Sequence, residues 1–128
     1  MIERKTYEEA LIDSEKNYRE LVEKAGIAIS IEDTEGNIKY FNMNNAELFG
    51  YKQEEMQYQS IRTLVHPDDL EMVLDYHQKR IAGGESPSRY RFRGIRKDSE
   101  TINLEVDSIS LKENGKIIGT RNYIWKIT

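Results

Sequence analysis

The last third of the chain constrains the fold most, because it holds three strand-like stretches, two turn signals and no helical pattern. Apolar residues alternate with three arginines in residues 89–95 (RYRFRGI), and a turn follows at residues 97–100 (KDSE). A second alternating stretch ends at the Asn-Gly pair of residues 114–115, a strong hairpin signal that leads into a final strand over residues 117–127. The sequence therefore predicts three antiparallel strands joined by hairpins.

The three arginines of residues 89–95 form a basic stripe on one face of their strand. We expect Phe92 to lie opposite Val106 in the next strand, because apolar residues would then pair with apolar ones. In that register Arg93 faces Glu105, and opposite charges across an antiparallel pair contribute roughly 0.2–1 kcal/mol each. The stripe is thus neutralised within its own sheet. With a net charge of −4 the chain also has no overall basic field, so we expect no nucleic-acid partner.

The first half of the domain predicts one more hairpin and several helices. Residues 27–32 (IAISIE) alternate as a strand does, residues 33–36 (DTEG) read as a turn, and residues 37–41 form the second strand. Helical patterns then cover a short segment capped by Asn42 and closed by Gly50, residues 53–65, and residues 67–82. This order predicts an α+β domain with an antiparallel sheet and helices on one face.

An amphipathic helix is predicted before the domain, over residues 7–25 (YEEALIDSEKNYRELVEKA). Apolar residues, Leu11, Tyr18 and Leu21 among them, recur there at alternating intervals of four and three. The stripe either packs on the domain's own core or forms a short coiled coil with another helix, and the pattern does not decide between these. We divide the chain into an N-terminal helix, residues 1–25, and a domain, residues 26–128.

A His-Pro-Asp-Asp cluster at residues 66–69 raises the question of a catalytic or metal site. Pro67 suits the first position of a helix, where its missing N–H costs nothing. Asp68 and Asp69 then fall in the first turn, where negative charge is favoured by the helix dipole. Neighbouring residues of one turn point in different directions, which does not suit a metal. We therefore interpret the cluster as a helix start and expect no metal site.

Composition narrows the function classes further. The chain has 128 residues, the size of one domain, and no cysteine. Disulfides, thiol nucleophiles and Cys-ligated metals are therefore excluded. No phosphate-binding glycine loop is present, and there are only two histidines, so we expect that this domain is not an enzyme. No apolar run is long enough to span a bilayer, and we expect a cytoplasmic location without membrane contact.

Four stretches together resemble the PAS domain family, the sensory-box type. They are residues 14–25 (SEKNYRELVEKA), 33–51 (the hairpin DTEGNIKYFN followed by FGY), 65–73 (VHPDDLEMV), and 96–128, from RKDSE to the closing KIT. The resemblance implies a five-stranded antiparallel sheet of order 2-1-5-4-3 wrapped by helices. It also implies a sensory or dimerisation module that regulates an attached histidine kinase or diguanylate cyclase or phosphodiesterase domain.

Two departures from the family pattern bear on function. Lys126 stands where the family often has an aspartate that couples the domain to the next element, so that coupling is in doubt. Relatives with covalent flavin photochemistry need a cysteine, which this chain lacks, so that photochemistry is excluded.

The resemblance also implies an internal cavity lined by the helix of residues 67–82. His77 shares the apolar face of that helix with Leu74, and haem-binding relatives take their iron ligand from a position nearer Leu74, so haem is not expected. A pH-sensitive or ligand-contacting His77 is one alternative, and a hydrogen-bonded core histidine is the other. Inward-facing polar residues either bond to one another or converge on a small ligand of unknown identity. The candidate lining residues are Asn45, Leu74, His77, Tyr90, Phe92, Ser108 and Asn122.

Large apolar residues of the final strand are predicted on the opposite face of the sheet. Tyr123 and Trp125 point outward if Ile124 points inward, and such residues are rarely left bare. We expect the N-terminal helix, or that of a second copy, to cover them through Leu11, Tyr18 and Leu21. The predicted partners are a second copy of the chain and an attached output domain.

Overall fold

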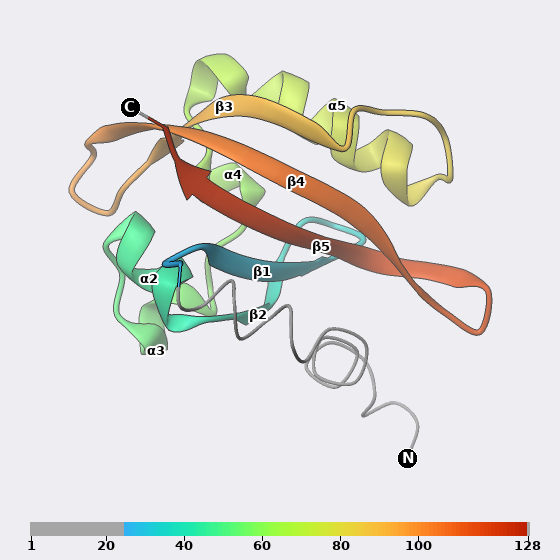
Figure 1. The fold of residues 1–128 in the computed structure, drawn as a ribbon, viewed down its shortest axis with the longest axis horizontal. Coiled ribbons are helices and arrows are strands. Elements are labelled where there is room, and N and C mark those ends of the chain that lie inside the picture. Colours follow the sequence, from blue (N-terminus) through green and yellow to red (C-terminus); the bar gives the residue numbers. More distant parts are fainter. Residues whose placement is uncertain (1–24, 128) are drawn as a thin grey trace.

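One five-stranded antiparallel sheet, with strand order β2-β1-β5-β4-β3, organises the domain (Figure 1). The structure, a computed structural model, describes residues 25–127, so the predicted helix of residues 7–25 lies outside the described residues, apart from Ala25. The strands are β1 (Ala28–Asp33), β2 (Ile38–Phe41), β3 (Arg89–Ile95), β4 (Thr101–Glu113) and β5 (Lys116–Lys126). The helices are α2 (Met43–Phe49), α3 (Gln53–Met56), α4 (Ile61–Leu64) and α5 (Pro67–Ile81). The predicted α+β class and strand order are confirmed.

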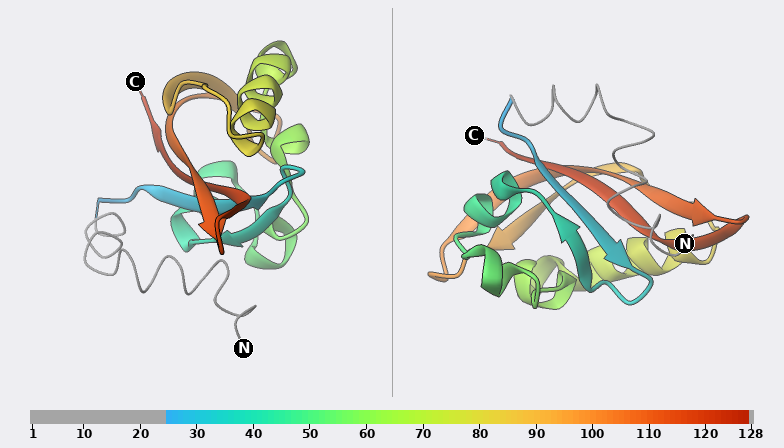
Figure 2. Two further views of the ribbon diagram at one scale, coloured as in Figure 1. Left: turned by 90° about the vertical axis from the view of Figure 1, so that its right-hand side faces the viewer. Right: turned by 90° about the horizontal axis from the view of Figure 1, so that it is seen from below.

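The first strand of the sheet lies against the last. β1 pairs antiparallel with β5, from Ala28 opposite Ile124 to Asp33 opposite Gly119. The β1–β2 hairpin is thereby joined to the β3–β4–β5 meander in one sheet. Within residues 25–127 the helices all come between β2 and β3 in the chain, and they gather on one side of the strands (Figure 2).

Helix α2 begins and ends at the residues that the sequence predicts. The side chain of Asn42 caps the helix, because its Oδ1 accepts from the backbone N–H of Asn45 at 3.0 Å. The same oxygen accepts from the backbone N–H of Ile29 at 3.0 Å, so the cap also fastens the helix to β1. Gly50 closes the helix at φ 79°, a left-handed conformation that costs glycine little.

The predicted pairing of β3 with β4 is wrong by two residues. Phe92 lies opposite Leu104 and not opposite Val106. The cause is the position of the turn, which lies one residue earlier than the predicted register requires. The backbone N–H of Arg96 donates to the carbonyl of Glu100 at 2.9 Å, which closes the loop around residues 97–99.

The basic stripe of β3 is nevertheless paired within the domain. Arg91 lies opposite Glu105, with 3.4 Å between Nε and Oε1, and Arg89 lies 3.4 Å from Asp107. Arg93, which was expected to face Glu105, reaches instead to the start of α5.

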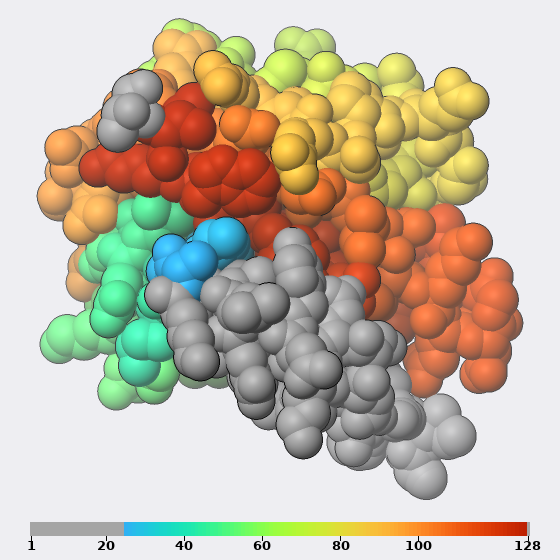
Figure 3. Space-filling model, in the orientation of Figure 1, coloured from blue at the N-terminus to red at the C-terminus, as the bar shows by residue number. Residues whose placement is uncertain are grey.

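Apolar clusters occupy both faces of the sheet. The helix-covered face, which we call the inner face, carries the main core, with Phe49, Met56 and Leu104 almost fully buried. The second cluster lies on the outer face and contains the buried residues Ile29, Ile31, Leu111 and Tyr123, with Trp125 packed against them. The predicted outward direction of Tyr123 and Trp125 is confirmed. Figure 3 views the molecule from a side where β3, β4 and β5 reach the surface.

Candidate functional site

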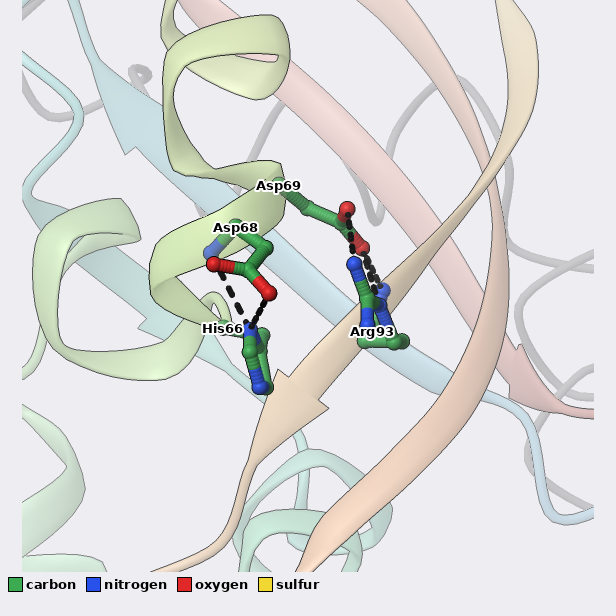
Figure 4. A network of polar contacts seen from close by, with 4 residues as sticks. All are labelled: His66, Asp68, Asp69 and Arg93. Carbon is green, nitrogen blue, oxygen red and sulfur yellow. Dashed lines mark hydrogen bonds and ion pairs between the residues drawn. The ribbon is translucent and has the colours of Figure 1, made fainter.

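The His-Pro-Asp-Asp cluster is the start of helix α5, as predicted (Figure 4). His66 is the residue before the first turn, and its Nδ1 accepts from the backbone N–H of Asp68 at 3.0 Å. Pro67 occupies the first helical position. Within residues 25–127, no group of three or more His, Asp or Glu side chains is placed to hold a metal ion.

Asp69 has a structural role that its position in the first turn did not reveal. Its carboxylate accepts from Nε of Arg93 at 3.0 Å, from Nη2 at 2.9 Å and from the backbone N–H of the same residue at 2.7 Å (Figure 4). The hydrogen bonds from Arg93 hold the pKa of the Asp69 carboxyl below its usual range. This three-bond contact fastens the start of α5 to β3.

A cavity lies between the inner face of the sheet and the helices. Its volume is about 40 Å³, counted as the space open to the centres of water molecules. One water needs roughly 10–15 Å³ of such space, so the cavity has room for a few waters or a ligand of similar size. Apolar residues from α2, α4, α5 and the sheet, with Phe49, Leu64 and Val73 among them, form much of the wall. The polar lining residues are Ser30, Glu32, Asn45, His77, Arg80, Tyr90, Ser108 and Asn122.

Strand register explains the polar floor of the cavity. Ser30, Asn122 and Ser108 are direct neighbours across β1, β5 and β4 on the inner face. Ser108 Oγ donates to Asn122 Oδ1 at 2.6 Å, and Asn122 Nδ2 donates to the hydroxyls of Ser30 (3.4 Å) and Thr120 (3.3 Å). These groups are buried and mutually satisfied, which is what a polar row in a core requires.

An acid on the next row of the floor extends this network. Glu32 lies opposite Thr120, whose hydroxyl donates to its carboxyl group. Burial raises the pKa of Glu32 to about 8, against an ordinary value of 4.5. The carboxyl group therefore holds its proton at neutral pH.

Three further ionisable side chains share the cavity lining with this acid. His77 on α5 is buried, and its Nε2 donates to the carbonyl of Thr34 at 3.3 Å. Burial lowers the pKa of His77, so the ring is neutral at neutral pH. Burial also lowers the pKa of Arg80 on α5 and raises that of Tyr90 on β3. One wall of the cavity thus combines an acid, a base and a guanidinium.

Arg80 and His77 also border open grooves outside the cavity. The groove formed by residues 84–88 and β4 shares Arg80 and Ser108 with the cavity. The guanidinium of Arg80 donates to the carbonyl of Pro87 in that loop. A second groove beside Thr34 shares His77. On the side of α5, the side chains of His77 and Arg80 therefore separate the cavity from solvent.

Six of the seven candidate lining residues meet at this one cavity: Asn45, His77, Tyr90, Phe92, Ser108 and Asn122. Leu74 does not line it. It borders the groove beside Thr34, because Val73, one position earlier on α5, takes the inward direction. Glu32 and Arg80 are lining residues that the sequence analysis missed. Their spacing in the sequence indicates the inward direction. Glu32 follows Ser30 by two on a strand, and Arg80 follows His77 by three on a helix, so each pair shares one face of its element.

Solved structures with this fold come from several signalling proteins. A PAS domain from Colwellia psychrerythraea is 23% identical, with a TM-score of 0.71 over 88% of this chain and 96% of that one. A sensory box histidine kinase/response regulator from Burkholderia thailandensis is 16% identical, with a TM-score of 0.69 over 87% of this chain and 84% of that one. The N-terminal domain of a diguanylate cyclase with a PAS/PAC sensor from Marinobacter aquaeolei is 15% identical, with a TM-score of 0.63 over 78% of this chain and 94% of that one. At these identities the likeness shows the fold.

The family itself is shown by the sequence comparison. No curated protein matches the chain significantly. No helix of residues 25–127 has the length and apolarity needed to cross a membrane. A family model described as PAS fold matches residues 38–122, which is more than half of the chain. This protein therefore belongs to the PAS fold family.

Proposed function

We propose that this PAS domain is a sensory module of a larger signal-transduction protein and binds a small molecule in the cavity between its helices and sheet. The attached output domain would be a histidine kinase or a diguanylate cyclase or phosphodiesterase. The proteins of this fold from Burkholderia thailandensis and Marinobacter aquaeolei carry such names. We assign no catalytic step to the domain itself.

The observation that carries this proposal is the mixed lining of the cavity. Apolar walls with a few convergent polar groups are typical of small-molecule sites. Here Glu32, His77 and Arg80 converge on one side of the space, and the amide of Asn45 lies on another element, α2. A space used only for packing would be filled with apolar side chains, since a buried ionisable group costs free energy.

Signalling would follow from a population shift between two packings of the helices on the sheet. A ligand that contacts α5 through His77 and Arg80 and the sheet through Glu32 favours the packing in which these groups are closest. α5 also contacts β5, which pairs with β1. A displacement of α5 would therefore reach the strand at which the chain enters the domain.

The test is one purification with two measurements. We expect native mass spectrometry to detect a bound small mass that denaturing conditions release, and an absorption spectrum to say whether that ligand is coloured. A colourless protein at its bare chain mass, whose cavity resonances also fail to respond to added small molecules, would contradict ligand sensing.

A second candidate is a dimerisation module without a ligand. The apolar cluster of the outer face, with Tyr123 and Trp125, favours it. In this case the N-terminal helix, through Leu11, Tyr18 and Leu21, and the outer face would form the contact between two copies. Sedimentation equilibrium of a Trp125→Ser variant should then show weaker self-association, whereas Tyr58→Ser, at an exposed residue after α3 and away from the sheet, should leave it unchanged. A monomeric wild-type chain would contradict dimerisation.

A further inference from the structure

Among the residues that the structure describes, Asn45 is the cavity-lining residue whose fully buried polar side-chain atoms have no hydrogen-bond partner. Asn45 lies on α2 and is 1% exposed. Neither its Oδ1 nor its Nδ2 has a hydrogen-bond partner, although both atoms are buried. The residue lines the cavity together with Phe49, one helical turn further on. A buried amide without partners is costly, and native proteins rarely retain one without a reason.

Two other buried asparagines show that this fold does satisfy its amides. Asn122 uses its oxygen for Ser108 and its nitrogen for two hydroxyls of the sheet. Asn42 accepts two backbone N–H groups, and its nitrogen donates to the carbonyl of Ile27 at 3.2 Å. Both of these amides hold protein elements together. Asn45 holds none, so its amide is available to a molecule in the cavity.

The chemistry of the amide restricts that molecule. A carboxamide presents one donor and one acceptor side by side, and the group that satisfies both presents an acceptor and a donor at the same spacing. Amides, ureas and lactams have such an edge. A carboxylate would place an oxygen against Oδ1, and an ammonium group cannot accept from Nδ2. The volume of about 40 Å³ restricts the ligand to a few heavy atoms.

We propose that the cavity binds a small uncharged molecule with an amide-type edge, namely a primary carboxamide, a urea or a lactam, which pairs with Asn45. This rests on the proposed function, since it names the ligand class of the same site. The apolar part of the ligand lies against residues such as Phe49, Ile38 and Val73.

Arg80 is the feature that favours the opposite chemistry, an anion. Its guanidinium, however, already donates to the carbonyl of Pro87 and also borders the open groove beside that loop. Asn45, in contrast, receives neither of its bonds from the residues that the structure describes. We therefore assign recognition to Asn45 and treat an anionic ligand as an outcome of the test.

The test compares three probes of nearly equal size on the intact chain: propionamide, propionate and propylammonium. Amide resonances of cavity residues are followed in ¹H–¹⁵N spectra during each titration. We expect saturable shifts with propionamide and affinities at least about tenfold weaker for both charged probes, because each leaves one atom of Asn45 unpaired. Asn45→Leu should weaken propionamide binding by a similar factor. Asn103→Leu, at an exposed position of β4, is the matched control and should not change it.

Three results would overturn the assignment. Tighter binding of propionate, lost in Arg80→Met, would make the ligand an anion while leaving small-molecule sensing intact. Equal propionamide binding by Asn45→Leu would remove Asn45 from recognition. Failure of all three probes to move any cavity resonance of the wild-type protein would contradict this ligand class, and it would contradict the proposed function as well if the purified protein also has its bare chain mass. The order of the three probes' affinities for the wild-type protein needs no variant, so it tests the ligand class even if Asn45→Leu does not fold.

Discussion

Glu32 makes the stability of this domain depend on pH in an unusual direction. Its pKa is about 8 in the folded protein, against an ordinary value of 4.5. Between these two pH values the folded state holds a proton that the unfolded state has lost. Raising the pH through this window therefore destabilises the fold, at up to about 1.4 kcal/mol per pH unit for one group. Most carboxylates that form ion pairs have a lowered pKa in the folded state instead, so they stabilise the fold as the pH rises.

The Glu32→Gln variant isolates this effect, because glutamine resembles the protonated acid at every pH. From pH 5.5 to pH 7.5 the wild type should lose about 1–3 kcal/mol of unfolding free energy relative to the variant, with the lower values allowing for residual solvation of a half-buried group. The charged or ionisable groups that interact with Glu32 are Asp33, Arg80 and Tyr90, and His77 lines the same cavity. His77 contributes with the other sign, since its lowered pKa costs stability as the pH falls below 6.5. That contribution is common to both proteins and cancels in the difference.

The assay is urea unfolding followed by the fluorescence of Trp125 at several pH values. Glu47→Gln, which changes an exposed carboxylate on α2, is the control and should retain the wild-type profile. Parallel profiles for wild type and Glu32→Gln between pH 5.5 and 7.5 would refute the reasoning. They would mean that Glu32 is ionised and paired in the folded state.

Three further substitutions test the architecture by urea unfolding. Asp69→Asn should lower the unfolding midpoint more than Asp68→Asn, because only Asp69 joins α5 to β3; equal effects would deny the contact a role. Gly119→Ala should cost about 3 kcal/mol or more, since the new Cβ would meet a backbone oxygen of β1 at 2.1 Å, whereas Gly84→Ala meets only ordinary contacts at 3.4 Å; a mild effect at residue 119 would contradict the tight β1–β5 pairing. Phe49→Ala should cost about 3–5 kcal/mol through the loss of core packing, and a change below about 1 kcal/mol would place the residue outside the core.

Local chemistry made the helix boundaries predictable. Asn42 and Gly50 enclose α2, and His66 with Pro67 starts α5, because caps and prolines act within one turn of chain. The family resemblance supplied the strand order. The register of β3 against β4 was missed because it depends on where a five-residue turn closes, and a shift of the turn by one residue moves every pair by two.

The charged part of the cavity could not be predicted in the same way. Glu32 and Arg80 have the alternation and helical spacing of inward residues, but charge normally directs a side chain to solvent. Only the structure shows that Thr120 and the carbonyl of Pro87 compensate them at these positions. The unpaired amide of Asn45 is likewise invisible in the sequence, since it depends on which partners are absent within reach.

The pairing of the first strand with the last also has a consequence for protein engineering. Ala28 near the start of β1 lies opposite Ile124 near the end of β5, so the chain enters and leaves the domain on adjacent strands, whose spacing in a sheet is about 4.8 Å. A surface loop of a host protein can therefore be opened and this domain inserted with little separation of the two cut ends. The domain is thus suited to chimeras in which it interrupts a host enzyme rather than precedes it.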